Sequence, residues 1–194
     1  MNQIVIYIGV LTEYQGIDLL LDAVPLVIRE FPRVKFLIVG YPNEDLYRQK
    51  AMARGIEKWV HFTGKVPHEE IPRYLSLADV AVSPKISTSE ANLKLLSYLA
   101  MGLPTVVFDN PVNREILGNL GIYAANHDAK SLGQALLEIL QDRSRARELG
   151  ALGREKATSD YSWSAVGQRL KLIYDSVERS TVVKPDAGPE EKNS

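Results

Sequence analysis

The sequence predicts an α/β protein, a doubly wound parallel sheet of about six strands with helices on both faces and a helical C-terminus. Short apolar runs alternate with longer amphipathic stretches over the first two thirds of the chain. Several of these runs are apolar throughout, which is typical of strands buried on both faces. From Ser131 onward the apolar residues recur only at helical spacing. Because strands separated by helices form crossover units, they stack into one parallel sheet.

Each expected strand is a short apolar run next to glycine, proline or polar residues. The expected strands are 4–10, 34–39, 59–62, 80–82, 105–108 and 122–123. Apolar residues spaced three or four apart predict a helix that includes Leu20 to Phe31, with Pro25 either kinking it or marking its early turns. Further helices are expected at 44–54, 69–77, 93–101 and 112–117, and after Ser131.

The length of 194 residues fits one domain, which we assign to 1–180. Residues 181–194 lack periodicity and are expected to form a disordered tail. The net charge of −1 gives no reason to expect nucleic acid as a partner. The chain has no cysteine, which excludes disulfides and thiolate chemistry.

No apolar run reaches the roughly 20 residues of a membrane span. The longest, 17–28, is interrupted by Asp18, Asp22 and Pro25. The N-terminus also lacks the basic and apolar segments of a signal peptide. We therefore expect a cytoplasmic protein, and we leave open a peripheral position at the inner face of the membrane.

Ligands of doubly wound sheets bind beyond the carboxyl ends of the strands, where the strand order reverses. The loop from Gly9 to Gly16 joins the first strand to the first helix, where backbone N–H groups and the helix dipole favour a phosphate. Its two glycines match neither a dinucleotide-binding motif nor a P-loop. A simple strand exit and helix entry therefore remains an alternative.

The densest cluster of polar candidates runs from Ser83 to Pro104 and has a helix start near 91–93, with Lys94 in the first turn. Backbone N–H groups and a lysine suit a diphosphate. The alternative is that Ser89 caps the helix and Lys94 is a solvated side chain. The three histidines lack metal-ligand spacing, so no metal is expected, and no GxSxG motif follows a strand.

Five segments in order resemble the C-terminal domain of group 1 glycosyltransferases, the retaining, nucleotide-sugar-dependent enzymes of the GT-B fold. They are GVLTEYQGIDLLLDAV, FLIVGYPNE, VHFTGKVPHEEIPRYLSLADVAVSP, NLKLLSYLAMGLPTVVFD and DYSWSAVGQRLKLIY. The likeness runs from about Ile4 to Tyr174. It implies a Rossmann-like domain that binds a nucleotide diphosphosugar, with the acceptor held by an N-terminal domain absent from this chain. Turnover by this chain alone is then not expected.

The resemblance also assigns site residues, in the numbering of this sequence. It implies that the Gly9, Gln15 and Gly16 positions face the diphosphate and that Lys65 and Val66 hold the base. The segment 90–97 would address sugar, phosphate and ribose, with Glu90 and Lys94 as the catalytic pair. The substrate-binding residues of this segment would be Asn92, Leu93 and Ser97. No cofactor is implied beyond the donor substrate.

Departures from the family pattern leave two hypotheses. The family usually has Arg and Lys where this chain has Val10 and Gln15, and two glutamates where it has Ser89 and Ser97. Glu90 lies one residue from the first of those glutamate positions and could replace it. The chain is either the donor-binding half of a glycosyltransferase or a non-catalytic relative that kept the fold for nucleotide binding, interaction or regulation.

Overall fold

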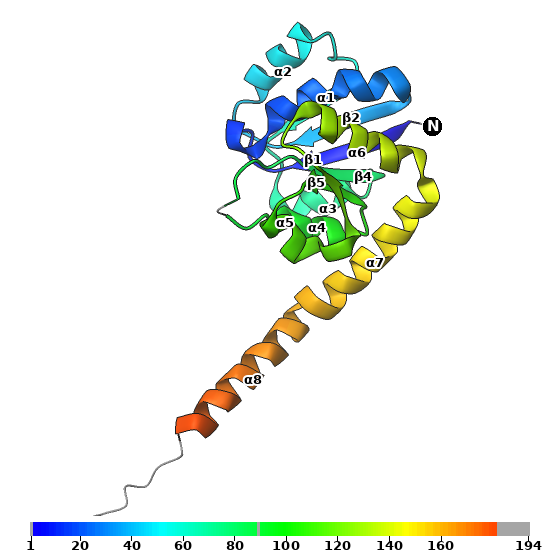
Figure 1. Cartoon of the computed structure of the whole chain (residues 1–194). Helices are drawn as coiled ribbons and strands as arrows, with labels where there is room; N and C mark the ends of the chain where they lie inside the picture. Colours follow the sequence, from blue (N-terminus) through cyan, green and yellow to red (C-terminus); the bar gives the residue numbers. More distant parts are fainter. Residues whose placement is uncertain (1, 89, 182–194) are drawn as a thin grey trace, which may run out of the picture. The chain divides into compact units, whose positions relative to one another are not determined.

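A computed structural model describes residues 2–88 and 90–181. Its six strands form one parallel sheet in the order β3-β2-β1-β4-β5-β6, which confirms the predicted fold class (Figure 1). The strands are β1 Gln3–Ile8, β2 Val34–Val39, β3 Val60–Gly64, β4 Val80–Ser83, β5 Thr105–Phe108 and β6 Gly121–Ala124. All four residues of β4 and of β5 are buried, as expected for strands covered on both faces.

The strand order reverses at β1. This strand pairs with β2 on one side and with β4 on the other, so that Ile6 lies opposite both Leu37 and Ala81. The crossovers that follow β1 and β4 therefore lead in opposite directions along the sheet. The loops that leave the carboxyl ends of these two strands flank the switch point, where doubly wound folds bind ligands.

Helices cover both faces of the sheet. The helix α1 packs against α6 on one face, and α3 and α4 lie on the other (Figure 1). The helix α6 begins at an Asp128 cap, whose carboxylate accepts a hydrogen bond from the Ser131 amide at 2.7 Å. The α-helices of this part are α1 Ile17–Glu30, α2 Glu44–Ala53, α3 Ile71–Leu75, α4 Lys94–Ala100, α5 Pro111–Leu117 and α6 Ala129–Gln141.

Pro25 lies well inside α1, so it does not mark the early turns of that helix. Two element boundaries near the site differ from the sequence expectation. The strand β1 ends at Ile8, because Gly9 has a φ of 138° that no strand residue adopts. The helix α4 begins at Lys94, just after the expected start at 91–93, because Lys85 bonds to the backbone carbonyls of residues 90 and 91.

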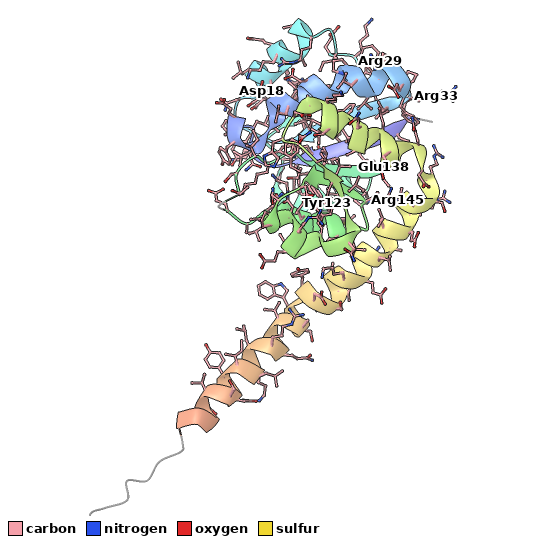
Figure 2. The ribbon with its side chains drawn as sticks, in the orientation of Figure 1. Asp18, Arg29, Arg33, Tyr123, Glu138 and Arg145 are labelled. Atoms are coloured by element: carbon pink, nitrogen blue, oxygen red, sulfur yellow. The ribbon has the colours of Figure 1, made fainter. Side chains whose placement is uncertain are left out.

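The chain forms two compact units, the first ending at Ala157 and the second beginning at Thr158. Two helices, α7 Arg143–Tyr161 and α8 Trp163–Thr181, follow α6. The Arg145 guanidinium of α7 pairs with the Glu138 carboxylate of α6 in the first unit (Figure 2). The assignment of 1–180 to one domain stays a prediction. All but the first residue of the expected tail, 182–194, lies outside the described residues.

Candidate functional site

The loops that follow β1 and β4 are in direct contact at the switch point. The Ile86 amide donates a hydrogen bond to the Tyr14 carbonyl at 3.0 Å. A Cβ on Gly16 would lie 1.9 Å from the Pro84 carbonyl oxygen, and Gly16 has a φ of 73°. Only glycine fits this approach and this backbone conformation. The loops after β1 and β4 are therefore fixed to each other at this place.

Lys94 spans the gap between the two segments. It is the first residue of α4, and its ammonium donates to the Gln15 Oε1 atom at 2.5 Å. The ammonium also lies 4.8 Å from the centroid of the Tyr7 ring. A Cβ on Gly9 would lie 3.0 Å from the Cε atom of Lys94. Three residues of the predicted diphosphate site, Gly9, Gln15 and Lys94, thus meet at one place.

The environment of Lys94 disfavours its charged form. Burial and, as the smaller cause, the positive charge of Lys85 together lower the pKa of Lys94 from 10.5 to about 7. Burial also raises the pKa of Tyr7, so this hydroxyl stays protonated and donates to the Val10 carbonyl at 2.8 Å. An anion placed here would restore the full charge of Lys94.

Lys85 was missed by the sequence analysis as a site residue. Its side chain is 4% exposed, and its ammonium donates to the Glu90 carboxylate at 3.2 Å. It also donates to the backbone carbonyls of Glu90 at 3.1 Å and of Ala91 at 3.3 Å. No periodicity marks this lysine, and its only sequence signal is its position directly after a buried strand and a proline.

Asn92 lies in a buried polar network behind the loop and is only 2% exposed. Ser83 donates to its Oδ1 atom at 3.2 Å, and its amide donates to the Asn113 Oδ1 atom at 2.9 Å. Asn113 in turn donates to the Phe108 carbonyl at 2.9 Å. The network ties the loop after β4 to the end of β5. Asn113 was not among the predicted site residues.

The remaining predicted residues of this segment differ in exposure. The Glu90 side chain is 64% exposed and Leu93 is 65% exposed. Ser97 is half-buried and lies three residues after Lys94 in α4, so both side chains share one side of the helix. Ser89, the alternative helix cap, lies outside the described residues.

A pocket of about 450 Å³ adjoins the first loop. Its lining residues are mostly apolar, and Val66 from the predicted base-binding stretch is among them. The ammonium of Lys65 lies 5.2 Å from the centroid of the Tyr41 ring, which also lines the pocket. The complete lining consists of Gly9, Val10, Val39, Gly40, Tyr41, Pro42, Val66 and Ile71. A flat apolar group fits this place better than a charged one.

Within residues 2–88 and 90–181, no three or more His, Asp or Glu side chains are grouped in a way that could hold a metal ion. In the same part of the chain, no helix has the length and apolar character needed to cross a membrane. The candidate site thus places a lysine and an apolar pocket side by side. This combination can bind a phosphate group that is attached to a ring system.

Residues 2–142 match the family model described as "Glycosyl transferases group 1". The chain belongs to the group 1 glycosyltransferases. This membership confirms the resemblance that the five sequence segments indicated.

Two relatives in this family are named mannosyltransferases. The phosphatidyl-myo-inositol mannosyltransferase of Mycobacterium leprae is 30% identical to this glycosyltransferase chain, over 86% of the chain and 44% of that protein. A Corynebacterium glutamicum protein is 26% identical over 85% of the chain and 45% of its own length. It is named a GDP-mannose-dependent monoacylated alpha-(1-6)-phosphatidylinositol monomannoside mannosyltransferase. The chain therefore spans less than half the length of these relatives.

Solved glycosyltransferase structures share the fold. Sucrose-phosphate synthase from Thermosynechococcus elongatus superimposes with a TM-score of 0.77 at 24% identity, over 92% of this chain and 46% of that one. The Anabaena protein HepE, solved in complex with UDP and glucose, gives a TM-score of 0.78 at 16% identity. That match covers 90% of this chain and 48% of HepE. The sheet order and helical layers are thus those of the GT-B fold.

Proposed function

We propose that this chain binds the nucleotide diphosphosugar donor of a glycosyltransferase, and that the whole protein transfers the sugar to an acceptor with retention of configuration. The observation that carries the proposal is the contact of the Gly9–Gly16 loop with Lys94 at the switch point, next to an apolar pocket. The diphosphate would lie between loop and lysine, and the base in the pocket beside Val66.

The chemistry of sugar transfer fits this arrangement. When the bond between sugar and diphosphate breaks, negative charge develops on the leaving nucleotide diphosphate. Groups that are already placed to stabilise this charge lower the barrier most. Lys94 and the N–H groups of the first loop would do so here, and Glu90 would contact the sugar. No metal ion is required in this scheme.

The names of the relatives support a choice of donor for testing. The Corynebacterium glutamicum relative is named GDP-mannose-dependent, whereas HepE was solved with UDP. We propose GDP-mannose as the first donor to test.

The acceptor would bind to an N-terminal domain outside this chain, since the chain spans less than half of its relatives. We also propose a cytoplasmic location, with the inner membrane face open because relatives are named for phosphatidylinositol substrates.

A second candidate function rests on the departures from the family pattern. Val10 and Gln15 carry no charge where relatives have cations, and Ser97 carries none where they have a carboxylate. In the structure Gln15 is bonded to Lys94, which partly offsets the first loss. A non-catalytic relative that keeps the fold for nucleotide binding, interaction or regulation is the alternative.

Calorimetric titration of the chain with GDP, UDP, GDP-mannose and pyrophosphate tests the donor-binding proposal. A donor-binding domain should bind at least one nucleotide diphosphate, and Val66→Asp should weaken nucleotide binding about tenfold or more while leaving pyrophosphate binding unchanged, because it places a charge in an apolar pocket. Lys130→Met, at an exposed lysine of α6, is the control. Absence of binding by all four ligands would contradict the proposal and favour a role in interaction or regulation.

A further inference from the structure

Lys85 is a buried lysine to which the family resemblance assigns no role. Lysine is rarely buried unless its charge is paired and its N–H groups are bonded. At Lys85, the carboxylate and carbonyl of Glu90 and the carbonyl of Ala91 lie within 3.3 Å of the ammonium. Three acceptors match the three protons of an ammonium. The group is therefore fully occupied by its own loop and has no donor left for a ligand.

The residues directly before and after Lys85 in the chain contact the first loop. The Pro84 carbonyl packs against Gly16, and the Ile86 amide bonds to Tyr14, so both neighbours are fixed to the first loop. The Lys85 side chain reaches to residues 90 and 91, just before α4. One residue thus connects the first loop with the approach to α4.

From these contacts we propose that Lys85 is a positioning residue of the donor site. It holds the Glu90 carboxylate and the 90–91 backbone at a fixed place relative to the Gly9–Gly16 loop. The inference rests on the proposed function insofar as Glu90 addresses the sugar of the donor. Glu90 is 64% exposed and would otherwise sample many rotamers, so the salt bridge selects the one presented to the donor.

The charge of Lys85 has a second, electrostatic effect on the site. It is a like charge that helps to lower the pKa of Lys94. Of the groups placed around Lys94, Tyr7 from β1 is held protonated and Gln15 from the first loop is neutral. Glu90 is the acid that pairs with Lys85 itself. Changes at the two ends of this salt bridge should therefore move the Lys94 pKa in opposite directions.

The first measurement uses the ligand-free chain and does not depend on donor binding. The side-chain signals of lysine are followed by NMR during a pH titration, and the Lys94 signal is identified by its loss in Lys94→Arg. Lys85→Met should raise the Lys94 pKa by about one unit, since a nearby like charge is gone. Glu90→Gln should lower it, since Lys85 loses its counter-charge. An unchanged Lys94 pKa in both variants would overturn the proposal.

The second measurement compares GDP-mannose with GDP. The ratio of their affinities should fall severalfold in Lys85→Met and in Glu90→Gln, with no further fall in the double variant, because the two residues act as one unit. Additive effects would overturn the positioning role. Lys85→Arg, which keeps the charge, should restore part of the ratio. If Lys85→Met does not fold, the exposed Glu90→Gln and the Lys85→Arg variant carry the test.

The two measurements separate failure of the inference from failure of the proposed function. If the unaltered chain binds no nucleotide, the donor-binding proposal fails, while the shift of the Lys94 pKa still decides whether Lys85 is coupled to Lys94. If the chain binds GDP-mannose but the affinity ratio is the same in Lys85→Met, only the inference fails. Lys130→Met, at an exposed lysine of α6, is the control.

Discussion

The two halves of the candidate site are built differently. The phosphate half, formed by the Gly9–Gly16 loop, Lys85 and Lys94, is closely packed, with Lys85 buried, Lys94 half-buried and both ammonium groups bonded. The base half, formed by the pocket between Tyr41 and Val66, is largely apolar and open. Stability and ligand binding at the phosphate half should therefore depend on the close approach of the two backbone segments and on charge. Ligand binding at the base half should depend on the shape of the pocket.

The largest effect is expected from Gly16→Ala. The new Cβ would lie 1.9 Å from the Pro84 carbonyl oxygen, and alanine would be strained at a φ of 73°. We expect a loss of about 3 kcal/mol or more in the free energy of unfolding. Gly55→Ala is the matched control, because Gly55 has a φ of 66° but nothing within 4 Å of its added Cβ.

Gly55→Ala should lower the free energy of unfolding by only about 1 kcal/mol, because only the left-handed backbone conformation is unfavourable for alanine there. Urea denaturation of both variants gives the comparison. Equal losses would show that the close approach of the two loops is not what Gly16 provides.

Lys94→Met tests the charge of the phosphate half. Removal of the ammonium should weaken GDP and pyrophosphate alike by about 1.5 to 3 kcal/mol, which is roughly ten- to hundredfold in affinity. Calorimetry with both ligands measures it. A loss of affinity for GDP without a loss of affinity for pyrophosphate would place Lys94 in the base half instead.

The pH dependence of stability follows from the lowered pKa of Lys94. Its folded pKa is about 7 against an ordinary value of 10.5, so between these values the unfolded chain binds more protons. The free energy of unfolding should therefore rise with pH across this window. Below the window Lys94 is protonated in both states, so the full cost of burying its charge lowers the free energy of unfolding. Relative to Lys94→Met, the free energy of unfolding should rise by about 1 to 3 kcal/mol between the two ends of the window. Parallel pH profiles for the two proteins would contradict the buried position of Lys94.

The smallest effect is expected from Ser97→Glu. The family resemblance implies a glutamate at the position of Ser97, which shares a side of α4 with Lys94. A glutamate would accept hydrogen bonds from ribose hydroxyls, so the preference for GDP over its 2′- and 3′-deoxy analogues should increase severalfold. Ser97→Gln, similar in size but without the charge, is the control. An unchanged preference would remove Ser97 from the ribose position.

Much of the fold was predictable because strands buried on both faces leave a strong local signal. The runs 34–39 and 105–108 were predicted with the boundaries that the structure has. The helix expected at 93–101 is one residue shorter at each end in the structure. Lys85 bonds to the backbone carbonyls just before it, through contacts that no local pattern contains. The same reason explains why Lys85 and Asn113 were missed.

The sequence by itself determined the layer architecture, whereas the ligand edge and the roles of Gly9, Gly16 and Lys94 stay predictions. Alternation of apolar runs with amphipathic stretches suffices for the architecture, since it depends on residues close together in the chain. Only the tertiary structure decided which polar groups meet. The bond from Lys94 to Gln15 joins residues 79 positions apart, and the burial of Lys85 depends on segments from both sides of the switch point. Contacts of this kind arise from packing, and packing has no period that a sequence can display.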